Sequence, residues 1–131
     1  MIHNATLKTE VLSILISHAS SALRLSDRQI KEKFFPYPIC VSDYYEKNER
    51  ERFIEIRFDD KETFITCTFD IHHRCNSAFI LPDRPDDTLT AYVDYLNSVH
   101  EYDYIGYRWI LSNGYLYCKQ SKDGIGFMIN C

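Results

Sequence analysis

The side chains best suited to metal or acid–base chemistry are concentrated in one short run of the sequence. This run, from Cys67 to Cys75, also contains His72 and His73. A zinc site uses four thiolate or imidazole ligands, usually in closely spaced pairs that one turn presents together. Cys67 instead belongs to an alternating apolar run, so only the other three side chains could converge. We therefore predict a polar hairpin turn here, with a metal site as the less favoured alternative.

Covalent catalysis is a second alternative at the same turn. Cys75, His73 and Asp70 could serve as nucleophile, base and orienting acid. However, no residue pattern specifies an oxyanion hole, and the chain has neither a GxGxxG nor a P-loop pattern. His18 and His100 lie on otherwise apolar helical stripes, which is typical of residues at the edge of a core. We predict that the chain is not an enzyme and has no catalytic residues, no metal and no cofactor.

The first part of the chain is predicted to be helical. Apolar residues recur at helical spacing between residues 5 and 23, which predicts an amphipathic helix. Ser26 then precedes Gln29 by three positions, which is the pattern of a capping box. We expect a short helix from Asp27 to about Phe34 after this cap.

Alternating apolar residues predict a hairpin in the middle of the chain, over residues 54–58 and 65–71. A turn centred on Asp60-Lys61 places both apolar sets on one side of this hairpin. In this register Ile56 faces Ile65 and Ile54 faces Cys67. Flanking strands are expected at residues 39–46 and 77–82.

The last third of the chain is predicted to contain a helix ending near His100 and then further strands. Asn113-Gly114 is a strong hairpin signal, and a two-residue loop there pairs Leu111 with Leu116 and Trp109 with Cys118. We expect a single α+β domain over residues 1–131. Its sheet should be largely antiparallel, with about six or seven strands built from hairpins, and two main helices and one short helix should pack on one face.

The composition favours a protein partner over a nucleic acid. The chain has a formal net charge of −4 and a pI of about 5.7, and an acidic domain repels a phosphate backbone. The N-terminal sequence lacks the layout of a signal peptide, and no apolar run is long enough to span a membrane. Five cysteines form no CxxC pair, which is typical of reduced thiols. We expect a cytoplasmic protein with a basic protein partner and no membrane association.

One stretch is only partly explained by structural needs. Between Tyr92 and Tyr107, five Tyr and three acidic residues are interleaved across a helix end and the strand after it. Tyr enrichment beside unpaired carboxylates is typical of docking surfaces for basic partners. The alternative is a solvated helix end with tyrosines at strand edges. The predicted partner-binding residues are Asp94, Tyr95, Glu101, Tyr102, Asp103 and Tyr104.

In size, charge, mixed α+β layout and the acid–Tyr stretch from Asp94 to Tyr107, the chain resembles the small acidic immunity proteins of bacterial toxin systems. This resemblance implies an antitoxin that neutralises a toxin, such as a nuclease, by covering its basic active face. A secretion-chaperone-like adaptor that grips an extended client is the alternative, and a small enzyme or metal-binding domain comes third. The oligomeric state is left open.

Overall fold

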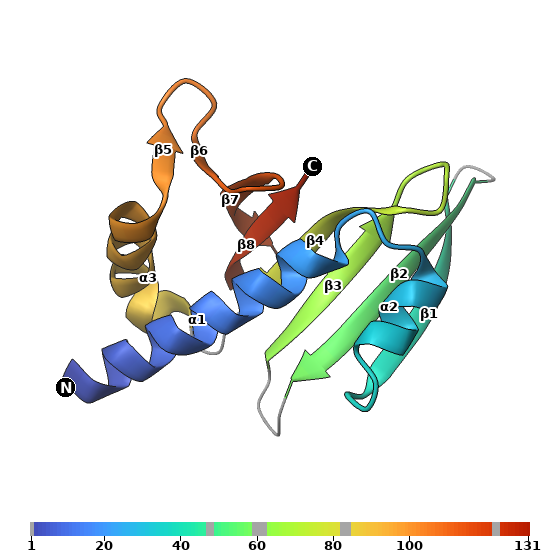
Figure 1. Ribbon diagram of the computed structural model, residues 1–131, viewed down its shortest axis with the longest axis horizontal. Helices are drawn as coiled ribbons and strands as arrows, with labels where there is room; N and C mark the ends of the chain where they lie inside the picture. Colours follow the sequence, from blue (N-terminus) through green and yellow to red (C-terminus); the bar gives the residue numbers. More distant parts are fainter. Residues whose placement is uncertain (1, 47–48, 59–62, 82–84, 122–123) are drawn as a thin grey trace.

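The protein is an α+β fold built on one antiparallel sheet, as Figure 1 shows for the computed structural model. The structure describes residues 2–46, 49–58, 63–81, 85–121 and 124–131. The described residues form three helices and eight strands: α1 (Ile2–Ala22), α2 (Asp27–Lys33), β1 (Ile39–Glu46), β2 (Glu49–Phe58), β3 (Thr63–Phe69), β4 (Cys75–Leu81), α3 (Pro85–Val99), β5 (Glu101–Asp103), β6 (Arg108–Ile110), β7 (Tyr115–Ser121) and β8 (Gly124–Asn130).

The strands are ordered β1-β2-β3-β4-β8-β7-β6-β5, and every neighbouring pair is antiparallel. The predicted α+β class and the antiparallel sheet are therefore confirmed. The prediction of six or seven strands is wrong, because the sheet has eight. The segment after α3 forms two strands, β5 and β6, of only three residues each, and so short a pair leaves little alternation in the sequence.

Local sequence signals account for the start of α2. The Ser26 hydroxyl accepts a hydrogen bond from the Gln29 N–H at 3.2 Å, and the Gln29 side chain accepts one from the Ser26 N–H at 2.9 Å. These two bonds satisfy backbone donors that the first turn of a helix leaves free. The predicted capping box is therefore confirmed.

The core lies on one face of the sheet, where inward-facing residues meet the helices. One row of directly paired positions crosses all eight strands: Val41, Ile54, Cys67, Ala78, Ile129, Leu116, Trp109 and Tyr102. The buried members of this row share one core cluster with residues of the helices, including Leu12, Leu15, Ile30 and Leu96. The predicted pairings of Ile56 with Ile65 and Ile54 with Cys67 are confirmed, while the predicted turn at Asp60-Lys61 lies outside the described residues.

The predicted register of the Asn113-Gly114 hairpin is wrong. The structure pairs Trp109 with Leu116 and Ile110 with Tyr115. Residues 111–114 therefore form a longer loop than the two residues expected. In this loop the Leu111 N–H donates to the Gly114 carbonyl at 2.9 Å.

Long-range contacts explain the longer loop. The Asn113 side-chain amide donates to the Ser20 carbonyl of α1 at 2.8 Å. The backbone of Gly114 lies so close to Asn130 on β8 that a Cβ atom would overlap the Asn130 carbonyl oxygen. These contacts with α1 and β8 select the loop conformation, and a local turn preference does not include them. Among the described residues, no helix is both long and apolar enough to cross a membrane.

Candidate functional site

The most exposed apolar surface of the described chain is the tip of the β5–β6 hairpin, which projects away from the rest of the molecule in Figure 1. The side chains of Tyr104, Ile105 and Tyr107 are 81%, 93% and 75% exposed. We call these three residues the tip. Single exposed apolar side chains are common on protein surfaces, whereas a contiguous group of large ones is typical of an interaction site.

The base of the hairpin is fixed to the core through Trp109. Trp109 is 4% exposed, and its indole N–H donates to the Asn97 side-chain oxygen of α3 at 2.9 Å. The Tyr102 ring packs edge-on against Trp109, with centroids 5.0 Å apart, and also against Tyr104 at 4.9 Å. An unbroken aromatic chain therefore connects the buried Trp109 to the exposed tip.

The turn between β5 and β6 is organised by Asp103. Its carboxylate accepts hydrogen bonds from the Ile105 N–H at 3.0 Å and from Arg108 Nε at 3.2 Å. Hydrogen bonds from the backbone N–H groups of Gly106 and Ile105, and then the contact with Arg108, hold the pKa of Asp103 below its usual value. A Cβ at Gly106 would lie 2.7 Å from the Asp103 carboxylate and 2.8 Å from Arg108 Nε. A larger residue at position 106 would therefore displace the Asp103 and Arg108 side chains from the positions in which they bond.

Arg108 connects the hairpin to the neighbouring strand β7. Its Nη1 donates to the Tyr117 hydroxyl at 3.1 Å, and its guanidinium carbon lies 3.6 Å from the centroid of the Tyr115 ring. The hydrogen bond with Tyr117, together with that to Asp103, raises the pKa of Arg108. Because both ends of the turn are fastened in this way, the tip is presented with little freedom to lose on binding.

The structure brings four of the six predicted binding residues together in this hairpin: Glu101, Tyr102, Asp103 and Tyr104. Asp94 and Tyr95 lie on α3, where Asp94 is exposed and Tyr95 packs against the core. Tyr95 and Tyr102 are only partly available to a partner, because both are half-buried and pack against the core. The expectation of an unpaired carboxylate is wrong for Asp103, which forms an ion pair with Arg108.

Sequence reasoning missed Ile105 and Tyr107 as candidate binding residues. The available signal was the run Tyr104-Ile105-Gly106-Tyr107, in which Gly106 interrupts an apolar segment. Glycine within a predicted strand often marks a bend or a close backbone approach. A bend at this point turns successive apolar side chains outward, whereas a continuous strand would have buried half of them.

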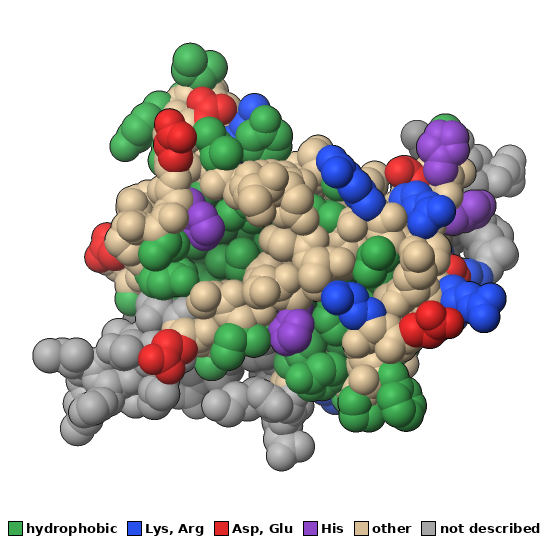
Figure 2. All heavy atoms as spheres, in the orientation of Figure 1, with side chains coloured by type: hydrophobic (Ala, Val, Ile, Leu, Met, Phe, Trp, Pro, Cys, Tyr) green, Lys and Arg blue, Asp and Glu red, His purple; other side chains and the backbone are tan. Residues whose placement is uncertain are grey.

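Charge is distributed unevenly over the molecule. From Asp94 to Arg108 the sequence has three acids, Asp94, Glu101 and Asp103, and one base, Arg108. In Figure 2, apolar side chains gather over the hairpin end with acidic and basic groups beside them, while most of the Lys and Arg side chains in view lie towards the opposite end, where acidic side chains lie among them. Next to the tip, Asp103 is paired with Arg108, so the excess of acid in this segment comes from Glu101 at the base of the hairpin and Asp94 on α3. A basic surface would complement these two carboxylates.

The run from Cys67 to Cys75 forms the predicted polar hairpin turn. Asp70 accepts hydrogen bonds from the backbone N–H groups of His72 at 2.8 Å and Arg74 at 3.1 Å. His72 and His73 are exposed, whereas Cys75 is 1% exposed. The described residues contain no group of three or more His, Cys, Asp or Glu side chains placed to hold a metal ion. The structure therefore does not assemble the residues of the alternative metal or nucleophile site.

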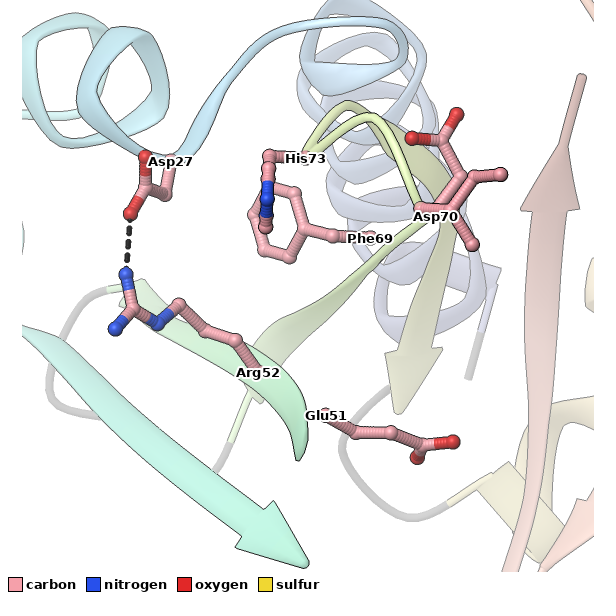
Figure 3. A pocket seen from close by; sticks show the side chains of 7 residues that line it. Asp27, Glu51, Arg52, Phe69, Asp70 and His73 are labelled. Atoms are coloured by element: carbon pink, nitrogen blue, oxygen red, sulfur yellow. Dashed lines mark hydrogen bonds and ion pairs between the residues drawn. The ribbon is translucent and has the colours of Figure 1, made fainter. Parts of the chain in front are cut away.

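A cavity of about 790 Å³ lies beside this turn, between the start of α2 and β2. Its lining includes Asp27, Glu51, Arg52, Asp70 and His73. Arg52 is held by Asp27 at 2.6 Å and by Asp43 at 3.0 Å. Figure 3 shows that the carboxylates of Glu51 and Asp70 do not point towards the Asp27–Arg52 pair or towards each other. Because its charged groups do not converge, this cavity is a weaker candidate than the tip.

The fold and the site define an α+β protein with an eight-stranded antiparallel sheet and an exposed apolar hairpin. Comparison with known proteins adds no assignment to this description: no protein-family model, no curated protein and no solved structure matches the chain.

Proposed function

We propose that this chain is a protein-binding domain that docks its partner through the tip of the β5–β6 hairpin. The observation that carries the proposal is the exposure of Tyr104, Ile105 and Tyr107 on a hairpin that is otherwise firmly anchored. Full burial of a large apolar side chain contributes about 1.5–3 kcal/mol. Burial of the three tip side chains in a partner pocket would therefore supply a large part of the free energy needed for a specific complex.

The hairpin combines two features of high-affinity binding sites, exposed aromatic anchors and a turn held in a fixed conformation. Binding energy concentrates in a few aromatic and large apolar anchors, surrounded by contacts that exclude water. Tyr104 and Tyr107 are such anchors, and the Asp103–Arg108 ion pair holds the turn that carries them. Preorganisation reduces the entropy lost on binding and raises affinity without any added contact.

Two exposed acids of the same segment indicate the chemistry of the partner. Glu101 lies at the base of the hairpin and Asp94 on α3, and both are exposed, so a partner pocket with a basic rim is favoured. Anionic lipid surfaces and nucleic acids are negatively charged and attract basic protein surfaces, so these acids disfavour both as partners. Enzymes that act on nucleic acids have basic, substrate-binding faces. The specific form of the proposal is therefore an immunity-type inhibitor that inserts its tip into the basic face of a toxin.

Site-specific photo-cross-linking tests the proposal in cells. A photoreactive residue at position 105 should form a discrete cross-link to one protein, identified by mass spectrometry. The matched control is position 71, because Ile71 is 88% exposed and Ile105 is 93% exposed. Cross-links of equal pattern at both positions, or cross-links at 105 to lipid or nucleic acid alone, would contradict the proposal. If the captured protein is a nuclease, the wild-type chain should inhibit it, whereas Ile105→Asp should not.

A further inference from the structure

The face of the sheet opposite the core carries a second set of large side chains, of which only Arg108, with its contacts to Tyr115 and Tyr117, also takes part in holding the hairpin. One row of positions on this face crosses the strands: Cys40, Glu55, Thr66, Phe79, Met128 and Tyr117. Arg108 extends the row to β6, because its guanidinium bonds the Tyr117 hydroxyl. An adjacent row contains Ser42, Phe53, Thr68, Ser77, Asn130, Tyr115 and Ile110.

The apolar members of this face do not belong to the core. Phe64, Phe79, Tyr115, Tyr117 and Met128 are half-buried, and none is part of the core cluster or packs against it. The Phe79 ring lies on Gly126, where a Cβ would come within 2.6 Å of a ring atom. Neighbouring parts of the sheet thus cover these side chains in part and leave the rest of their surface exposed.

We propose that this face is the interface of a homodimer, with the two sheets packed face to face. The two-fold axis runs parallel to the strands between β4 and β8, at the centre of the strand order. Such an axis sets β4 of one copy against β8 of the other, β3 against β7 and β2 against β6. Aligned packing of two sheets at about 10 Å is a common arrangement in proteins.

Along these two rows the residues of the face complement each other under this operation, whereas in the third row Lys119, whose ammonium lies 3.9 Å from Met128 Sδ, comes opposite Phe64. Phe79 meets Met128 of the second copy at the centre, and Thr66 meets Tyr117. Towards the edges, Glu55 meets Arg108 of the second copy, so that each Arg108 lies between Asp103 of its own chain and Glu55 of the other. In the adjacent row Phe53 meets Ile110, an apolar pair. A face that pairs its own acid with its own base favours a second copy over an unrelated partner.

The size of the face suits a dimer of ordinary strength. Strands lie about 4.8 Å apart and rise about 3.3 Å per residue. The central strands β3, β4, β8 and β7, of seven residues each, and three facing residues from each of β2 and β6 therefore cover roughly 540 Å² in projection. Side-chain relief makes the accessible area larger, and a standard interface buries about 800 Å² per partner. In this dimer the two hairpins lie at opposite edges, and each tip is in the turn beyond the ends of β5 and β6.

Sedimentation equilibrium of the purified chain, with three variants, tests the dimer. The wild type should have a mass of about 31 kDa, twice the 15.5 kDa of one chain. Phe79→Lys should sediment as a monomer. Glu55→Lys changes an exposed side chain, sets Lys against Arg108 twice, and should weaken dimerisation at least about 10-fold. Glu10→Lys, the same charge change on exposed Glu10 of α1, should leave the dimer intact.

Two results would overturn the inference. One is a wild-type chain that is monomeric at about 100 µM, a concentration at which even a weak dimer of micromolar Kd is formed. The other is a dimer that neither Phe79→Lys nor Glu55→Lys weakens, since the interface then lies elsewhere. Glu55→Lys decides the matter if Phe79→Lys fails to fold. Neither result bears on the hairpin tip, whose partner is tested by cross-linking at position 105.

Discussion

The anchoring of the hairpin predicts a large difference between two aromatic residues only two positions apart. Trp109 is 4% exposed, contacts Tyr102 and Phe127, and donates a hydrogen bond to Asn97. Truncation of a buried Trp to Ala costs about 3–5 kcal/mol of unfolding free energy. Tyr107 is 75% exposed, and truncation of so exposed a side chain changes stability by no more than about 0.5 kcal/mol.

These free energies translate into measurable shifts of the melting temperature. An unfolding entropy of about 2.1 cal/mol/K per residue means that each kcal/mol lowers Tm by roughly 4 °C for a chain of this size. Trp109→Ala should therefore lower Tm by about 10–18 °C, and Tyr107→Ala by less than about 2 °C. Differential scanning calorimetry measures both. Equal shifts for the two variants would refute the inference that Trp109 anchors the hairpin.

Two further predictions concern pH. Burial, and then the charge of Lys33, lowers the pKa of His18, whose ring stacks on Phe58 at 4.9 Å. Because the pKa of His18 is lower in the folded state, its contribution to stability is complete above about pH 6.5 and falls as the pH drops below that value. In urea titrations at pH 7.5 and 5.5, His18→Phe should reduce this loss of stability. The part that remains is due to His100, whose pKa is also lowered by burial. An unchanged fall would contradict the assignment. The pKa of Asp103 is lowered by the Gly106 and Ile105 N–H groups and by Arg108, so its contribution to stability is present above its unfolded pKa of about 3.9 and is lost as the pH falls through the folded value. Asp103→Asn should therefore lower Tm at pH 7 and lower it progressively less below pH 4. An equal decrease of Tm at both pH values would show that the charge of Asp103 is not involved.

Much of the fold follows from patterns that are local in the sequence. The capping box at Ser26 and Gln29 needs only residues three positions apart, and the hairpin of β2 and β3 is selected by alternation that agrees with the observed register. Such signals are readable because each depends on neighbours along the chain. The polar turn at Asp70 is of the same kind.

The errors arose where distant contacts decide the conformation. The loop at Asn113-Gly114 is set by Ser20 and Asn130, which no local turn preference includes. For the candidate site, the tyrosines and acids between Tyr92 and Tyr107 marked the right stretch of sequence, but as a helix end and one strand, whereas the structure forms the β5–β6 hairpin there. The sequence could not show that Asp103 is used within the turn by Arg108, or that the bend at Gly106 exposes Ile105 and Tyr107. Pairing and exposure are properties of the folded arrangement.

The affinity of the partner captured at position 105, measured by isothermal titration calorimetry, tests the central claim most directly. Ile105→Asp places a charge where an apolar anchor is buried in the complex. Loss of about 1.5–3 kcal/mol of apolar burial should raise Kd by roughly 10- to 150-fold. Ile71→Asp, the same change at a similarly exposed isoleucine, should leave Kd unchanged. A partner that binds Ile105→Asp as tightly as the wild type, or that loses equal affinity with both variants, would contradict docking through the tip.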